Sequence, residues 1–170
     1  RLNDLGDEFM ISSGQIGLLP ENIYFGVVDI NKRKVTFNFL NQEVRVSNNL
    51  NDVYDIKIIA GDKEYVESMS QNILSSIPEE FSLGQNYPNP FNPVTRMDYS
   101  LPQSSKVVIS IYNVLGQEIK TLVNQEQDYG YHSISWDGTD DSGMSVASGV
   151  YFTQMRSTSF SQSKKMLLLK

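Results

Sequence analysis

The 170-residue chain contains no cysteine and a single histidine, His132. Without cysteine it can form no disulfide, no thiolate nucleophile and no cysteine zinc site. One histidine leaves a single imidazole for acid–base or triad chemistry. No apolar run is long enough to span a bilayer as a helix. These absences exclude disulfide-stabilised proteins, enzymes with a cysteine nucleophile and proteins with cysteine zinc sites.

Positive charge is also scarce, since 14 basic residues stand against 20 acidic ones and the net charge is −6. Neither half carries a basic stripe, so we expect no nucleic-acid partner. The chain starts at Arg1, and no charged start followed by an apolar stretch is present. We therefore expect no signal peptide and interpret the chain as a piece of a longer protein. We also expect no cofactor and a monomeric state.

Three prolines within seven residues mark residues 87–93. Each proline fixes its φ angle and removes a backbone donor, and the residue before it favours extended geometry. The stretch therefore fits neither a helix nor a central strand. We expect an extended entry segment near a domain boundary, anchored by Tyr87 and Phe91. Its members are Tyr87, Pro88, Asn89, Pro90, Phe91, Asn92 and Pro93.

Short alternating runs separated by polar turns fill residues 1–67. This spacing predicts an antiparallel sheet or small sandwich, with residues 64–66 in its last strand. We interpret it as a β-rich domain, or as the end of a larger β domain that could be an enzyme. Residues 68–80 are rich in serine and contain Pro78, so we predict a linker there.

Two clusters in the first half have both a binding and a structural interpretation. Lys32, Arg33 and Lys34 could contact an anionic partner, but a solvated hairpin tip is favoured. Five aromatic residues could form a sugar-stacking platform, but alternation places most of them on buried faces. They are Tyr24, Phe25, Phe37, Phe39 and Tyr54.

About seven strands joined by tight turns are predicted in the second half. The strongest covers residues 106–114 and places Val107, Ile109 and Ile111 on one face. Trp136 is the expected core anchor, on the same strand face as His132. We therefore predict an all-β fold, with an immunoglobulin-like antiparallel β-sandwich over residues 81–170.

Five motifs in this half carry a family resemblance. They are, in order, residues 81–93 (FSLGQNYPNPFNP), 111–119 (IYNVLGQEI), 130–138 (GYHSISWDG), 147–151 (ASGVY) and 164–170 (KKMLLLK). Together they resemble the C-terminal sorting domain, type A, of type IX secretion cargo. That family is similar to the immunoglobulin-like part of flagellar hook-capping proteins.

The resemblance implies a secretion address rather than a catalytic domain. Cargo with such tails is exported to the periplasm and carried across the outer membrane by a translocon. A sortase-like protease often removes the tail, and the cargo is attached to surface lipopolysaccharide or released. For this chain the resemblance implies a type IX translocon and a sortase-like component as partners, and a cell-surface or extracellular destination. The linker before Phe81 would be the region that is cut.

The resemblance also implies where the sorting determinants lie. They are Gly149, Val150 and Tyr151, and Lys164, Lys165, Met166, Leu167, Leu168, Leu169 and Lys170. The terminal lysines could simply keep an edge strand soluble. Alternatively, a translocon component could add to this edge as an extra strand. Both interpretations stay open at this point.

Two further features could carry chemistry or bind a ligand. His132 lies on the face of Trp136 without a nucleophile motif, so a structural role is favoured. Asp137, Asp140 and Asp141 are weak calcium candidates, because their glycine-bracketed loop lacks the full EF-hand pattern. Asx-type turns explain the same residues. The alternative function is therefore a non-catalytic surface stalk or adhesion module that binds carbohydrate or calcium.

Overall fold

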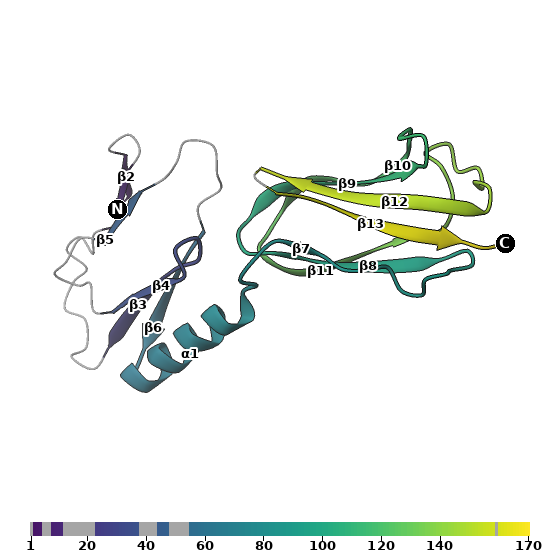
Figure 1. Ribbon diagram of the computed structural model, residues 1–170. Coiled ribbons are helices and arrows are strands. Elements are labelled where there is room, and N and C mark those ends of the chain that lie inside the picture. The colour runs from purple at the N-terminus through teal and green to yellow at the C-terminus, as the bar shows by residue number, and fades with distance from the viewer. Residues whose placement is uncertain (1, 5–7, 12–22, 38–43, 48–54, 159) are drawn as a thin grey trace. The chain divides into compact units, whose positions relative to one another are not determined.

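The structure of the protein is a computed structural model that describes residues 2–4, 8–11, 23–37, 44–47, 55–158 and 160–170. The chain divides into a first unit, Arg1–Ile77, and a second unit, Pro78–Lys170 (Figure 1). Within the described ranges, no helix is long and apolar enough to cross a membrane.

The first unit contains two three-stranded antiparallel sheets and one helix. One sheet has the order β1-β2-β5, and the other has the order β4-β3-β6. The helix α1 packs on β3, where a Cβ added to Gly26 would lie 2.8 Å from Val66 Cγ1. Glycine therefore lets the helix approach the sheet closely. The elements are β1 (Leu2–Asp4), β2 (Glu8–Ile11), β3 (Tyr24–Asp29), β4 (Lys34–Phe37), β5 (Val44–Ser47), β6 (Ile56–Gly61) and α1 (Lys63–Ser76).

The helix α1 corrects the sequence prediction of a strand at residues 64–66 and a linker at 68–80. Asp62 caps its N-terminus, since the carboxylate accepts the Tyr65 N–H at 2.8 Å. Val66 and Ser70, one turn apart, are fully buried. Ser70 Oγ donates to Val66 O at 2.7 Å, so its hydroxyl is satisfied within the helix. The serine content that suggested a linker is thus compatible with a packed helix.

The hairpin tip is also more than a solvated turn. Arg33 adopts a positive φ of 50° and turns its guanidinium toward the end of α1. It donates to Leu74 O at 3.2 Å and to Ile77 O at 3.0 Å. These carbonyls lie at the C-terminal end of the helix, which favours a cation. Arg33 therefore ties the β3–β4 hairpin to α1.

The aromatic residues of the first unit are partly packed. The Tyr24 and Phe37 rings lie 6.0 Å apart between centroids, and both side chains are half-buried, as is Phe25. This agrees with the core interpretation rather than with an open platform. Phe39 and Tyr54 lie outside the described residues.

The second unit is an immunoglobulin-like β-sandwich, as predicted. A four-stranded sheet, β10-β9-β12-β13, faces a three-stranded sheet, β11-β8-β7 (Figure 1). All pairs within these sheets are antiparallel. The strands are β7 (Ser82–Leu83), β8 (Thr95–Leu101), β9 (Ser105–Asn113), β10 (Glu118–Gln127), β11 (Gly130–Trp136), β12 (Gly149–Ser157) and β13 (Phe160–Leu168).

The inner faces of the two sheets form one apolar core. Val107, Ile109 and Ile111 of β9 are fully buried, which confirms the face predicted from their alternation. Trp136 is 1% exposed and lies at the centre of an aromatic group. Its ring centroid is 5.6 Å from that of Phe91 and 5.1 Å from that of Tyr151. The core therefore joins β11, β12 and the proline-rich segment.

Candidate functional site

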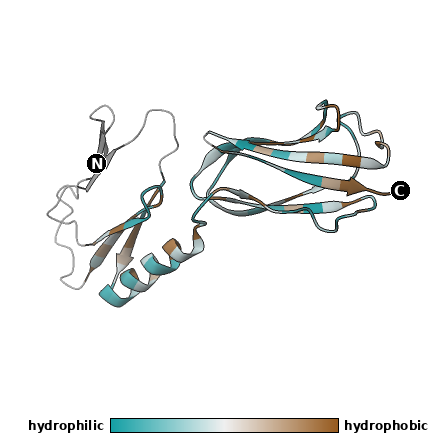
Figure 2. Ribbon diagram, in the orientation of Figure 1, coloured by the Kyte–Doolittle hydropathy of each residue, from teal (hydrophilic) through white to brown (hydrophobic). Residues whose placement is uncertain are grey.

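The terminal strand β13 and the start of β12 lie side by side at one edge of the sandwich. In their antiparallel register, Gly149 pairs with Leu168, and Tyr151 pairs with Met166. The structure thus brings together the two groups of residues that the sequence singles out as sorting determinants. β13 is the outer strand of its sheet, and Figure 2 shows its last residues as apolar.

Side chains of this strand pair alternate between the core and the solvent. Met166 and Leu168 are fully buried, whereas Lys165 is exposed. Tyr151 is 7% exposed, and its hydroxyl donates to Ala147 O at 2.8 Å. Burial raises the pKa of the Tyr151 hydroxyl, so the group stays neutral. Met166 and Leu168 therefore hold the terminal strand to the core, whereas Lys165 and Leu169 are exposed to solvent.

Gly149 begins this strand pair with a φ angle of +157°, which residues that carry a side chain rarely adopt. An added Cβ would meet no atom within 4 Å, so the backbone angle and not crowding requires glycine here. Gly149 of the predicted motif is therefore needed for the backbone angle at which the chain enters β12.

The proline-rich stretch runs along the outer edge of β13. Phe91 N–H donates to Leu167 O at 3.0 Å, and Leu169 N–H donates to Phe91 O at 2.9 Å. Asn89 Oδ1 accepts the Leu167 N–H at 3.0 Å, and Gln85 Nε2 donates to Lys165 O at 2.8 Å. We call residues 85–91 the covering segment, because they occupy backbone groups that an edge strand leaves open.

Hydrogen bonds to β8 and within the segment hold the covering segment in place. Asn86 is 2% exposed, and its Nδ2 donates to Pro88 O at 3.0 Å and to Thr95 Oγ1 at 2.9 Å. Tyr87 pairs with Arg96 through two backbone hydrogen bonds of 2.8 and 3.0 Å. Prolines can lie here because the segment meets β13 through Phe91 and side-chain amides rather than a full ladder. The peptide bonds before Pro88, Pro90 and Pro93 are cis.

Of the two predicted anchors, one is confirmed and one is wrong. Phe91 is 2% exposed and packs against Trp136, as an anchor should. Tyr87 is 82% exposed, so its ring contributes little to the core. The backbone of Tyr87, and not its side chain, holds that end of the segment to β8.

The aspartate-rich loop, residues 137–143, lies against the opposite edge of the same sheet. Asp141 N–H donates to Ile119 O at 3.2 Å, and Asp141 Oδ1 accepts the Thr121 N–H at 3.2 Å. The Lys120 ammonium lies 3.5 Å from Asp137 Oδ1. Ile119, Lys120 and Thr121 belong to β10, so each edge of the four-stranded sheet is contacted by an irregular segment.

The carboxylates of this loop accept hydrogen bonds from within the loop. Asp140 Oδ1 accepts the Ser142 N–H at 2.9 Å and the Met144 N–H at 2.9 Å. The Ser142 hydroxyl lowers the pKa of Asp140, and the Thr139 hydroxyl lowers the pKa of Asp137. Among the described residues, no three acidic or histidine side chains gather as metal ligands do. The geometry is that of Asx-type turns.

His132 packs as a structural residue. Its ring stacks on Tyr99, with centroids 5.3 Å apart and planes at 18°. Its Nε2 donates to Asp128 O at 2.8 Å. The Tyr99 hydroxyl donates in turn to Gln127 Oε1 at 2.8 Å, and burial raises the pKa of Tyr99. Among the described residues, no serine hydroxyl or carboxylate is hydrogen-bonded to the imidazole, so it lacks the partners of a triad.

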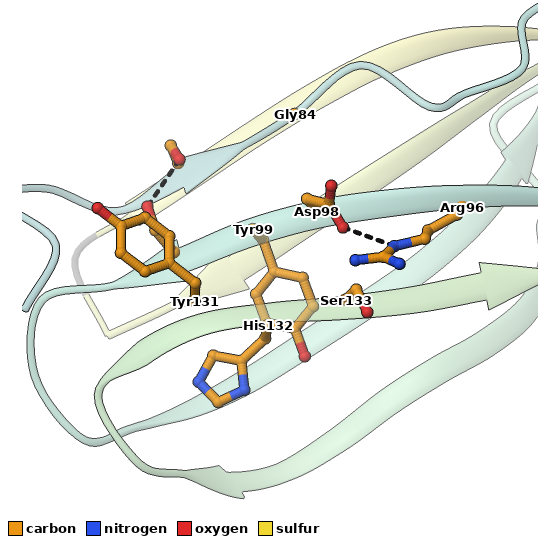
Figure 3. Close-up of a pocket in the computed structure, with 9 residues that line it drawn as sticks. Gly84, Arg96, Asp98, Tyr99, Tyr131, His132 and Ser133 are labelled. Atoms are coloured by element: carbon orange, nitrogen blue, oxygen red, sulfur yellow. Dashed lines mark hydrogen bonds and ion pairs between the residues drawn. The ribbon is translucent and has the colours of Figure 1, made fainter. Parts of the chain in front are cut away.

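A shallow hollow of about 400 Å³ lies beside His132 on the three-stranded sheet (Figure 3). Arg96 Nε and Asp98 Oδ1 form an exposed ion pair of 2.8 Å within it. Tyr131 is 76% exposed at its rim. Nothing in this hollow pairs a nucleophile with a base, so its side chains indicate a surface depression rather than an active site. Its lining is Ser82, Gly84, Arg96, Asp98, Tyr99, Ser100, Tyr131, His132 and Ser133.

Sequence reasoning missed the amide side chains that contact the edge of β13. Gln85 has no predicted role and Asn89 is predicted only as a member of the proline-rich segment, and their partners, Lys165 and Leu167, lie far away in the chain. The available signal was the combination of amide side chains with prolines beside a predicted edge strand. Such residues supply hydrogen bonds where a regular ladder cannot form.

The match to a protein-family model lies in the second unit. Residues 94–161 match the family model described as the FlgD Ig-like domain. This range lies within the sandwich and includes β8 to β12. Among curated proteins, no relative matches the sequence.

Solved structures that are similar to the chain include three bacterial proteins. FlgD from P. aeruginosa has a TM-score of 0.36 and 24% identity, over 44% of this chain and 57% of that one. PorZ, described as a surface component of the type IX secretion system of Porphyromonas gingivalis, has a TM-score of 0.37 and 16% identity. That match covers 54% of this chain and 12% of PorZ.

Dimeric latent PorU from Porphyromonas gingivalis has a TM-score of 0.42 and 14% identity, over 95% of this chain and 18% of PorU. This chain therefore spans less than two thirds of each of these three proteins.

Proposed function

We propose that the second unit is a C-terminal sorting signal that directs a cargo protein through the type IX secretion system. The observation that carries the proposal is the placement of the terminal motif. Lys164 and Lys165 lie on an outer strand, and the apolar residues of the motif pair that strand with residues 149–151. A folded edge with fixed register is a surface that a partner protein can read.

The sequence motifs support the same proposal, because they meet in one folded unit. The proline-rich motif covers β13, the Gly149–Tyr151 motif pairs with it, and Trp136 packs between them. Each motif thus contributes to presenting the terminal strand. The sandwich acts by recognition and performs no catalysis, while the parent protein could carry an activity of its own.

The proposed secretion route implies which proteins the chain meets and where the cargo is delivered. The cargo passes through the periplasm and is recognised by a type IX translocon component. A sortase-like protease then removes the tail, and the cargo is attached to lipopolysaccharide or released at the cell surface. Because α1 extends to Ser76, Arg33 binds its end and Pro78 is buried, the exposed residues Glu79 and Glu80 are the stretch we assign to cleavage. Proteases cut exposed connectors more readily than packed helices.

A transfer experiment tests this function. A periplasmic passenger protein is fused to residues 78–170 or, as the matched control, to residues 78–163. We expect the first fusion to reach the cell surface and the second to stay in the periplasm, as measured by surface labelling and cell fractionation. Periplasmic retention of the longer fusion, with its sandwich folded and protease-resistant, would contradict the proposal. So would surface display of the shorter one.

A further inference from the structure

The outer edge of β13 is covered over only part of its length. Lys165 O, both backbone groups of Leu167 and the Leu169 N–H bond to the covering segment. In an antiparallel strand, backbone groups of alternate residues point to opposite sides. Ser161 and Ser163 therefore also turn their N–H and C=O away from β12. Over the described ranges, neither serine has a hydrogen bond on that side, and both are exposed. β7 does contact this part of β13, but through a side chain, since the Leu83 N–H donates to Gln162 Oε1 at 2.8 Å.

The charge beside this open edge is positive. Lys164 is half-buried and Lys165 exposed, and no described carboxylate lies within 4 Å of either ammonium. A second copy of the chain, paired edge to edge, would bring four lysines together, which is unfavourable. An extended segment with carboxylates would instead neutralise them. The charge thus selects an acidic strand over self-association.

Resting on the proposed function, we propose that residues 161–165 are the docking edge of the sorting signal. An extended acidic segment of a secretion component adds there as a further strand of the sheet. The N–H and C=O groups of Ser161 and Ser163 supply the backbone ladder, and Lys164 and Lys165 supply the charge. Asn89 and Phe91 already occupy the edge beyond Lys165, so the covering segment sets the end of the docked strand.

A proline at position 163 tests the ladder without disturbing the fold. The Ser163 N–H faces away from β12, so proline removes no bond of the β12–β13 pair. Ser163→Ala is the matched control. We expect both variants of the 170-residue chain to melt near the native temperature. Surface display should fall about tenfold in Ser163→Pro, the factor that 1.4 kcal/mol represents, and stay unchanged in Ser163→Ala.

A charge reversal tests the acidic partner independently. Lys164→Glu combined with Lys165→Glu should also lower display about tenfold, whereas the double substitution to arginine should keep it. If Ser163→Pro melts at a lower temperature, the test of the docking edge rests on the double variant Lys164→Glu and Lys165→Glu. The two lysine side chains contribute little to the core, so this variant should fold normally.

The outcomes separate this inference from the function on which it rests. Normal display of the folded proline variant, or of the double glutamate variant, overturns the docking edge. If those variants are displayed normally while the fusion ending at residue 163 fails to reach the surface, the sorting function stands and only the docking edge is wrong. If that truncated fusion is displayed normally, the sorting function itself fails.

Discussion

Phe91 and Tyr87 lie four residues apart in the same proline-rich stretch, yet their side chains have opposite environments. Phe91 is 2% exposed beside Trp136, and Tyr87 is 82% exposed. Both are aromatic residues next to a proline, so the local sequence is nearly the same. Only the path of the chain past the sandwich decides which ring enters the core. The contribution of each ring to stability follows from burial and not from residue type.

This pair gives a matched prediction at the residue scale. Phe91→Ala should lower the free energy of unfolding by about 3–5 kcal/mol, because it leaves a cavity against Trp136. Tyr87→Ala should change it by no more than about 0.5 kcal/mol, since the backbone bonds to Arg96 remain. Chemical denaturation of the two variants provides the measurement. Equal destabilisation by both would contradict the assignment of Phe91, and not Tyr87, as the aromatic anchor.

At the scale of the element, the four-stranded sheet is defined by what lies along its two edges. The covering segment contacts β13, and the aspartate-rich loop contacts β10. Gly138 of that loop adopts φ +72° and approaches Leu168 so closely that a Cβ would lie 3.4 Å from Leu168 Cδ2. The loop therefore contacts the terminal strand as well as β10. Irregular segments of this kind limit unwanted pairing at open sheet edges.

The aspartate loop predicts a particular pH dependence. The Ser142 hydroxyl holds the pKa of Asp140 below its ordinary value of 3.8. A carboxyl with a lowered folded-state pKa stabilises the fold above its unfolded pKa, and this contribution is lost as the pH falls below about 4. Asp140→Asn should therefore reduce the drop in melting temperature between pH 5 and pH 2.5. An unchanged drop in the variant would contradict this role.

The same melting experiment addresses calcium at neutral pH. Because the loop carboxylates bond within their own loop and to β10, added calcium should leave the melting temperature unchanged. A calcium-dependent rise would favour the alternative function, a surface adhesion module.

Periodicity in the sequence predicts the strands and their faces well, but it misses contacts that alternation does not encode. The buried face of β9 and the shared face of His132, Ile134 and Trp136 follow directly from alternation. The helix α1 is missed because serines suggest a linker, although their hydroxyls bond back to the helix. The contacts of Asn89 and Gln85 with β13 are missed because they join residues about eighty positions apart.

At the scale of the whole molecule, the chain consists of two compact units. The first unit ends with α1, whose last carbonyls bind Arg33. The second begins at Pro78 and ends with the strand that we propose as the signal. The covering segment follows closely after the start of the second unit and contacts its last strand. The beginning and the end of the proposed address are therefore hydrogen-bonded to each other.

Amide hydrogen exchange of the 170-residue chain, read residue by residue, tests this arrangement most directly. The account predicts that the Leu167 and Leu169 amides exchange slowly, because Asn89 and Phe91 accept their hydrogen bonds. The Ser161 and Ser163 amides should exchange nearly as fast as exposed amides, about a hundredfold faster or more. Fast exchange at Leu167 and Leu169, or protection of all four amides alike, would contradict a terminal strand that is covered at one end and open at the other.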